Sequence, residues 1–288
     1  MLNRQPFAAT PYQYAATDFG NIAYREAGTG PAAIFVHGVL LNGHFWDPSI
    51  ERLAGVRRCI AIDILAHGAT RAGIDQDLSF DAQAAMLAAF CGALKLDQVD
   101  VVANDSGGGI AQFFAARPPD LIRCLVLTDC DTHDNWPPKA AEPLRRLAKE
   151  GGLGPLGRRM LEDLAFARAS FSSGFEHPDR LAAEDFRTWL APLFESEAPT
   201  RSLERFIAAF DNRQTVAVAS SLRQLLAPTL IVWGTSDDFF PLKWAYWLRG
   251  AIPGAREVIE LESAKLFFPW ERPEEFAGAV GDFWQSVN

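Results

Sequence analysis

The chain has 288 residues, of which 49% are hydrophobic and 22% charged, and its formal net charge is −9 at pH 7. This length suits one large domain or a domain that carries an insertion. The acidic balance argues against nucleic acid or an anionic membrane as the main partner.

Short apolar runs alternate with helical patterns along most of the chain. This alternation predicts a mostly parallel sheet between two layers of helices. The predicted strands are 32–36, 58–62, 99–102, 124–128, 229–233 and 257–261. The predicted helices are 79–94, 106–116, 243–251 and 273–284. Residues 14–22 and 23–26 predict an antiparallel hairpin at the sheet edge, joined around Gly20-Asn21.

The alternation stops between residues 135 and 214, where Leu, Phe, Arg, Glu and Pro are frequent. Short helices are predicted there, at 143–150, 157–169, 180–193 and 202–210. The sequence therefore predicts a core of residues 1–134 and 215–288. Residues 135–214 are expected to form a helical cap over the C-terminal edge of the sheet.

No apolar run approaches the roughly 20 residues that cross a bilayer. Residues 1–10 lack the apolar centre of a signal peptide. The four cysteines, Cys59, Cys91, Cys124 and Cys130, show no metal-type spacing. We therefore expect reduced cysteines, a cytoplasmic protein and no metal site.

The most informative stretch runs from Val101 to Gly109 and predicts a buried strand, a very tight turn and a helix. Ala103 and Gly107 stand two residues before and two after Asp105. A turn this sharp tolerates only small residues at those two positions. The pattern matches a nucleophile elbow, with a carboxylate at its apex instead of a serine. Two alternatives are an N-cap role for Asp105 and a shifted frame in which Ser106 is the nucleophile.

Four landmarks occur in order: His37-Gly38-Val39-Leu40, residues 63–68, the turn at Asp105, and residues 233–241. Together they resemble the α/β-hydrolase superfamily over essentially the whole chain. The acidic elbow resembles the branch with haloalkane dehalogenases, fluoroacetate dehalogenases and epoxide hydrolases. In that branch an aspartate attacks carbon and forms an alkyl ester.

The resemblance implies roles for several residues. Asp105 would be the nucleophile, and the N–H groups of Val39 and Ser106 would form the oxyanion hole. Asp237 would match the acid that orients a catalytic histidine. An ordinary acidic turn at Asp237, or Asp238 in its place, is the alternative.

The expected catalytic histidine is missing. All five histidines, His37, His44, His67, His133 and His177, precede residue 178. In the family the histidine shortly precedes an acidic residue and a final helix that begins with Pro. Counting back from Glu271, the matching acidic residue here, places the histidine position at Leu266, give or take one residue. Without a general base, an ester on Asp105 would form and then stall, because nothing would activate the water.

The chain also departs from each branch that it resembles. Haloalkane dehalogenases hold the halide with a Trp after the nucleophile, where this chain has Ser106, and with an Asn where it has Val39. Fluoroacetate dehalogenases have Arg after the nucleophile. Epoxide hydrolases use cap tyrosines, but all four tyrosines here lie outside residues 135–214. The resemblance therefore does not single out one of these three activities for this chain.

His133, between Asp131 and Asp134 just after a predicted strand, is the candidate substitute base. A cap-hinge or surface histidine is the alternative. The predicted pocket residues are His37, His44, Trp46, Leu266 and Phe267. His37 could instead order the oxyanion loop, and His44 could lie outside the pocket.

Three functions fit these features. The first is hydrolysis of a small apolar substrate with an ester, lactone, epoxide or carbon–halogen bond. The second is a lyase, isomerase or cyclase in which Asp105 moves a proton. The third is a ligand-binding protein without turnover. We expect no cofactor, a small apolar substrate as partner, and a monomer or homodimer.

Overall fold

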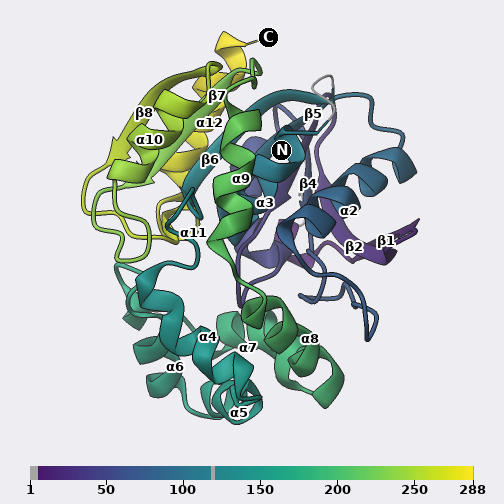
Figure 1. Cartoon of the computed structure of the whole chain (residues 1–288), viewed down its shortest axis with the longest axis vertical. Helices are drawn as coiled ribbons and strands as arrows, with labels where there is room; N and C mark the ends of the chain where they lie inside the picture. Colours follow the sequence, from purple (N-terminus) through teal and green to yellow (C-terminus); the bar gives the residue numbers. More distant parts are fainter. Residues whose placement is uncertain (1–5, 118–120, 288) are drawn as a thin grey trace.

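The computed structural model describes residues 6–117 and 121–287, and its centre is an eight-stranded sheet (Figure 1). The strand order is β1-β2-β4-β3-β5-β6-β7-β8. β2 pairs antiparallel with β1 and β4, and all other pairs are parallel. The strands are β1 (Gln13–Thr17), β2 (Gly20–Ala27), β3 (Ala32–Val36), β4 (Arg58–Ile62), β5 (Val99–Asp105), β6 (Ile122–Cys130), β7 (Thr229–Gly234) and β8 (Ala255–Leu261).

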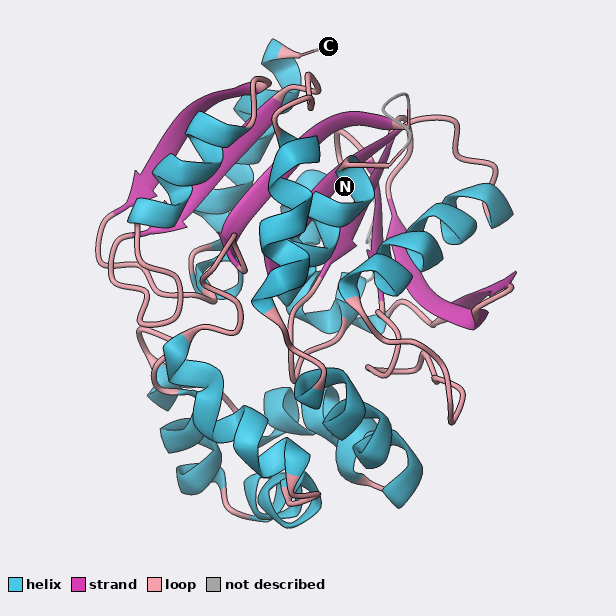
Figure 2. Ribbon diagram, viewed as in Figure 1, coloured by secondary structure: helices cyan, strands magenta, loops and turns pink. Residues whose placement is uncertain are grey.

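Helices lie on both sides of this sheet (Figure 2). α2, α3 and α9 pack in front of it as drawn in Figure 1, and α1 packs with α12. Every residue of β3 and β5 is buried, as expected of parallel strands covered on both faces. The predicted fold class is therefore confirmed. The α-helices outside residues 131–211 are α1 (Asp47–Leu53), α2 (Phe80–Ala93), α3 (Ser106–Ala115), α9 (Asn212–Leu222), α10 (Lys243–Ala251), α11 (Phe268–Glu271) and α12 (Pro273–Ser286).

The N-terminal hairpin is present, but its predicted turn was misplaced. β1 ends at Thr17 and pairs with Gly20, so the turn lies at Asp18-Phe19, before the predicted Gly20-Asn21. The Thr17 side chain closes the turn by accepting the N–H of Phe19. Gly20, at φ +102°, supplies the left-handed backbone that the chain needs to enter β2.

Five helices between β6 and α9 form a separate layer, which we call the insertion helices. Figure 1 shows them below the sheet, at the end toward which the parallel strands point. They are α4 (Glu142–Lys149), α5 (Leu153–Glu162), α6 (Leu164–Phe171), α7 (Ala183–Phe194) and α8 (Glu197–Ala208). Single 3-10 turns precede α4 at Lys139–Ala141 and α7 at Pro178–Arg180.

The single helix predicted at 157–169 is two helices, α5 and α6. They meet at Asp163, whose side chain caps α6 by accepting the N–H of Phe166. α9 was not predicted separately. It begins at Asn212, before the predicted end of the insertion, and packs against α3 of the core.

In the described ranges, 6–117 and 121–287, no helix combines the length and apolar character needed to cross a bilayer. Cys59, Cys91, Cys124 and Cys130 are all buried, and each carries a free thiol.

Candidate active site

Asp105 ends β5, and α3 begins at the next residue. Its backbone has φ +56° and ψ −133°, a conformation that a residue with a side chain rarely adopts. Two glycines make room for this turn: Gly107, two residues after Asp105, and Gly38, in the loop after β3. A Cβ on Gly107 would collide with the Val36 carbonyl oxygen, and one on Gly38 with Asp105 Oδ2. The geometry is that of the predicted elbow, with Asp105 at its apex.

The loop after β3 contacts the Asp105 carboxyl group directly. The Val39 N–H donates to Asp105 Oδ2 at 2.9 Å. This is one of the two N–H groups that the sequence assigned to an oxyanion hole. A backbone donor in a buried site stabilises negative charge without having to reorient.

Burial and charge act together on Asp105, which is 9% exposed. Burial raises the pKa of its carboxyl group, the N–H groups of Val39 and Ser106 oppose the rise, and the charge of Asp237 adds to it. The resulting pKa is about 7. Asp105 is therefore a carboxyl group that can both hold and release a proton near neutral pH.

Asp131 follows the end of β6, the strand that pairs with β5. Its Oδ2 accepts the hydroxyl hydrogen of Ser106 at 2.7 Å. Burial, followed by the charge of Asp105, raises the pKa of Asp131 well above its usual range. From the sequence, Asp131 was predicted only to flank His133. Asp131 directly follows β6 at the C-terminal edge of the sheet, and this position is the sequence signal that could have predicted a role in the active site for Asp131 itself.

Asp237 is 8% exposed, and its Oδ1 accepts the N–H of Phe239 at 2.7 Å. Burial is the main reason that its pKa rises to about 7. Its Oδ2 is buried and has no hydrogen-bond partner among the described residues. Nearby, Asp129 accepts the N–H of Gly234, and burial followed by the charge of Asp237 raises the pKa of Asp129.

Leu266, at the predicted histidine position, lines the same cavity as Asp105. Its carbonyl accepts the Asn104 side-chain amide at 3.0 Å, which ties the loop after β8 to the elbow. Phe267 lines the cavity too, and its N–H donates to the Gly174 carbonyl at 2.9 Å. Both residues lie where the sequence predicted.

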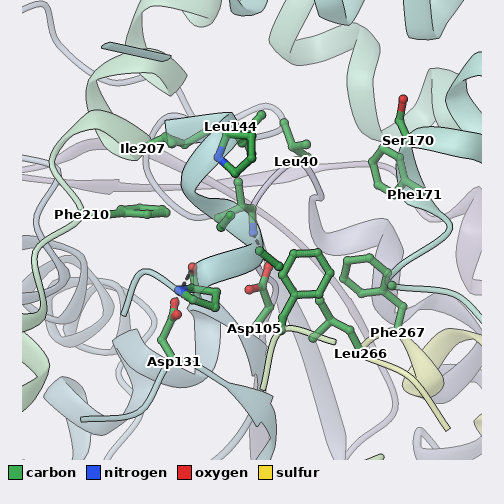
Figure 3. A pocket seen from close by; sticks show the side chains of 18 of the residues that line it. Leu40, Asp105, Asp131, Leu144, Ser170, Phe171, Ile207, Phe210, Leu266 and Phe267 are labelled. Atoms are coloured by element: carbon green, nitrogen blue, oxygen red, sulfur yellow. Dashed lines mark hydrogen bonds between the residues drawn. The ribbon is translucent and has the colours of Figure 1, made fainter. Parts of the chain in front are cut away.

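The cavity has a volume of about 340 Å³ and lies between the sheet end and the insertion helices. Of the described side chains that line it, only Asp105, Ser106, Asp131 and Ser170 are polar. Figure 3 shows Asp105 flanked by Asp131 on one side and by Leu266 and Phe267 on the other. The apolar lining includes Leu40, Leu144, Leu147, Leu156, Met160, Phe171, Ile207, Phe210 and Phe239. Such a space suits a small, lipophilic ligand with its reactive group at Asp105.

Three predicted pocket residues lie outside this lining. His37 is fully buried, where its Nδ1–H donates to the Gly38 carbonyl and its Nε2 accepts the Ile64 N–H. It orders the loop that carries Val39, which was the alternative interpretation. His44 Nδ1 pairs with Asp47 at 2.8 Å. Trp46 is buried in the core against Phe35.

The structure does not bring His133 to the cavity. Its ring packs 4.7 Å from Trp247, and its Nδ1 lies 3.5 Å from Asp134. The backbone has φ +48° at this residue, and its carbonyl accepts the Thr215 hydroxyl. His133 therefore stabilises the junction between β6 and α9 rather than facing Asp105. Within the described part of the chain, no cluster of His, Cys, Asp or Glu has metal-binding geometry.

A family model described as "alpha/beta hydrolase fold" matches residues 31–271. The chain is 24% identical over 270 residues to haloalkane dehalogenase 2 of Mycobacterium bovis, covering 91% of this chain and 90% of the relative. It is 24% identical over 287 residues to monoacylglycerol lipase abhd6-B of Xenopus laevis, covering 96% and 81%. The solved structure of epoxide hydrolase CorEH superposes with a TM-score of 0.79 at 20% identity, covering 96% and 99%. The chain therefore belongs to the alpha/beta hydrolase fold family.

Proposed function

We propose that this protein is a hydrolase of small lipophilic substrates and that Asp105 is its reacting carboxyl group. One observation carries the proposal: a carboxyl group stands at a strained elbow, contacts the Val39 N–H and lines an apolar cavity. Strain of this kind costs about 1–3 kcal/mol and persists where the surrounding structure enforces it, often at active sites.

The chemistry proposed for Asp105 is attack on an electrophilic carbon. An epoxide or alkyl halide would leave an alkyl ester on Asp105, with the ring oxygen or the halide as leaving group. An ester or lactone would leave a mixed acid anhydride on Asp105, with the alcohol oxygen as leaving group. Water then attacks the Asp105 carboxyl carbon of that intermediate, and the N–H groups of Val39 and Ser106 stabilise the oxyanion. The haloalkane dehalogenase and epoxide hydrolase similar to this chain support this choice of bonds.

The insertion helices act in this proposal as a cap. They contribute apolar side chains such as Leu144, Phe171 and Ile207 to the cavity that Asp105 lines. Excluding water from the site strengthens every electrostatic contact with the carboxyl group.

A second candidate is proton transfer without hydrolysis, in a lyase, isomerase or cyclase. A specific observation favours it: the pKa of Asp105 is about 7, and no histidine is among the described residues that line the cavity. A carboxyl group with such a pKa is an effective acid or base at neutral pH.

Single-turnover reactions in ¹⁸O-labelled water separate these possibilities. With enzyme in excess over an epoxide or alkyl halide, a nucleophilic Asp105 transfers its own unlabelled oxygen to the first product. The peptide that contains Asp105 then gains the label. Label in the first product and none in Asp105 would contradict the nucleophile. Deuterium exchange from heavy water into a carbonyl substrate, without hydrolysis, would support the second candidate.

Two variants complete the experiment. Asp105→Asn should abolish turnover because it removes the reacting group. Asp134→Asn is the matched control, since Asp134 is exposed and outside the cavity lining. It should react at the rate of the unmodified protein.

A further inference from the structure

Asp131 is a buried carboxyl group that the steps above leave without a role. It is 1% exposed and lines the cavity together with Asp105. Its Oδ2 accepts the Ser106 hydroxyl at 2.7 Å, while its Oδ1 is buried with no hydrogen-bond partner among the described residues. A buried carboxylate oxygen without a partner is costly, so this site favours a bound proton or a ligand that supplies one.

The surroundings of Asp131 add no cation. None of the ion pairs formed by described residues includes it. The negative charge of Asp105 adds to burial in raising the pKa of Asp131. Two close carboxyl groups in such a site share one proton, because both cannot ionise together.

We propose that Asp131 is a second catalytic carboxyl group, which protonates an oxygen leaving group and then takes a proton from water. The inference rests on the proposed function, since it requires an ester on Asp105. It also assigns a general base to a cavity whose described lining contains no histidine.

The steps balance for an epoxide. An Asp105 oxygen attacks a ring carbon, the carbon–oxygen bond breaks, and the ring oxygen takes the proton of Asp131. The ionised Asp131 then removes a proton from water, whose oxygen attacks the carboxyl carbon of the Asp105 ester. The tetrahedral intermediate collapses, and the departing alkoxide takes the proton from Asp131. The diol leaves, the proton on the new Asp105 carboxylic acid returns to Asp131, and the pair again holds one proton.

The same arrangement selects a substrate class. An oxygen leaving group needs a proton and receives one from Asp131, whereas a halide leaves as an anion and needs hydrogen-bond donors. No described side chain in the cavity lining has an indole, amide or guanidinium N–H group. The hydroxyl of Ser106 already donates to Asp131. The site therefore favours epoxides over alkyl halides.

Matched terminal epoxides and alkyl bromides of equal chain length test the inference. The unmodified protein should turn over the epoxides faster. Asp131→Asn, which keeps an acceptor for Ser106, should lower epoxide turnover at least about 100-fold, the usual contribution of general acid–base catalysis. The bromides should still alkylate Asp105 in this variant, because bromide departs without a proton. That ester should then persist, visible as added mass on the peptide that contains Asp105.

Further variants separate catalysis from positioning. Formate should partly restore epoxide turnover in Asp131→Ala, because a small acid can occupy the space and carry the proton. If Ser106→Ala loses as much activity as Asp131→Asn, Asp131 only positions Ser106, and the inference is wrong. Asp134→Asn is the exposed control, and melting curves verify that each variant folds.

The inference and the proposed function fail in different ways. If Asp131→Asn hydrolyses the epoxides within about twofold of the unmodified protein, far less than an acid–base group contributes, Asp131 is not catalytic while Asp105 can still be. If the unmodified protein reacts with none of these reagents, or Asp105→Asn stays active, the proposed function is overturned and this inference with it.

Discussion

Asp105 and its neighbours show which part of a site a linear sequence can reveal. The elbow was predicted from Ala103 and Gly107, because steric limits on a tight turn act over two residues of chain. The contact between Ser106 and Asp131 was not predicted, because it depends on the pairing of β5 with β6. His37 was placed in the pocket by its position after a strand, but both ring nitrogens bind backbone groups in the core.

Leu266→His should restore a histidine at the family's position. The buried Oδ2 of Asp237 has no partner among the described residues and could accept an imidazole N–H. We expect breakdown of an Asp105 ester to accelerate at least about tenfold, toward the range of general-base catalysis. The measurement is the decay of added mass on the Asp105 peptide. An unchanged decay would show that position 266 does not present a base to the ester.

Gly38→Ala tests the close approach of the β3 loop to the elbow. Its Cβ would collide with Asp105 Oδ2, so we expect lost activity and a stability loss of about 1–3 kcal/mol. Gly278→Ala is the matched control within α12, since no atom outside the adjoining turns of that helix lies within 4 Å of its added Cβ. It should leave activity unchanged and stabilise the helix by about 0.5–1 kcal/mol. Denaturant unfolding and turnover together check both; equal behaviour of the two variants would contradict the geometry.

Among the elements, the core strands and helices were predicted well, and the shorter helices less so. Buried parallel strands are continuous apolar runs, which a sequence displays directly. α1 has seven residues and was missed. α5 and α6 were merged, because an N-cap such as Asp163 interrupts a helix without interrupting its apolar spacing.

The segment before α7 is held to α11 by Glu271, the last residue of that helix. Its carboxyl group accepts the N–H groups of Glu176 and His177, at 2.7 and 2.8 Å. Glu271→Ala removes both acceptors, at a cost of about 1–3 kcal/mol. Because this connection supports the cavity wall at Gly174 and Phe267, we expect a several-fold higher KM with kcat nearly unchanged. A loss confined to kcat would contradict this structural role.

For the whole molecule, stability should depend on the buried carboxyl groups at the sheet end. Asp105 and Asp237 each have a pKa of about 7 in the fold, above the ordinary value of 3.8, chiefly because of burial. Between these values the folded protein keeps protons that the unfolded chain has released. Raising the pH from about 4 to about 7 should therefore lower the free energy of unfolding.

Asp105→Asn removes one of these ionisations. The change that this substitution causes in the free energy of unfolding should be more favourable at about pH 8 than at about pH 4, by on the order of 2 kcal/mol. This free-energy difference is smaller than the whole pKa shift of Asp105 would give. The charge of Asp237 causes part of that pKa shift, and Asp237 itself titrates over the same pH range. Urea unfolding at both pH values measures this difference. A variant with the same pH dependence as the unmodified protein would contradict the raised pKa.

Whether Asp105 reacts covalently with substrate can be measured by mass spectrometry of the unmodified protein, quenched during reaction with alkyl halides, epoxides and activated esters. Peptide mapping then locates any added group. We expect a transient adduct on Asp105, within the cavity that the insertion helices cover. Turnover with no adduct in the quenched samples, or an adduct on another residue, would contradict it.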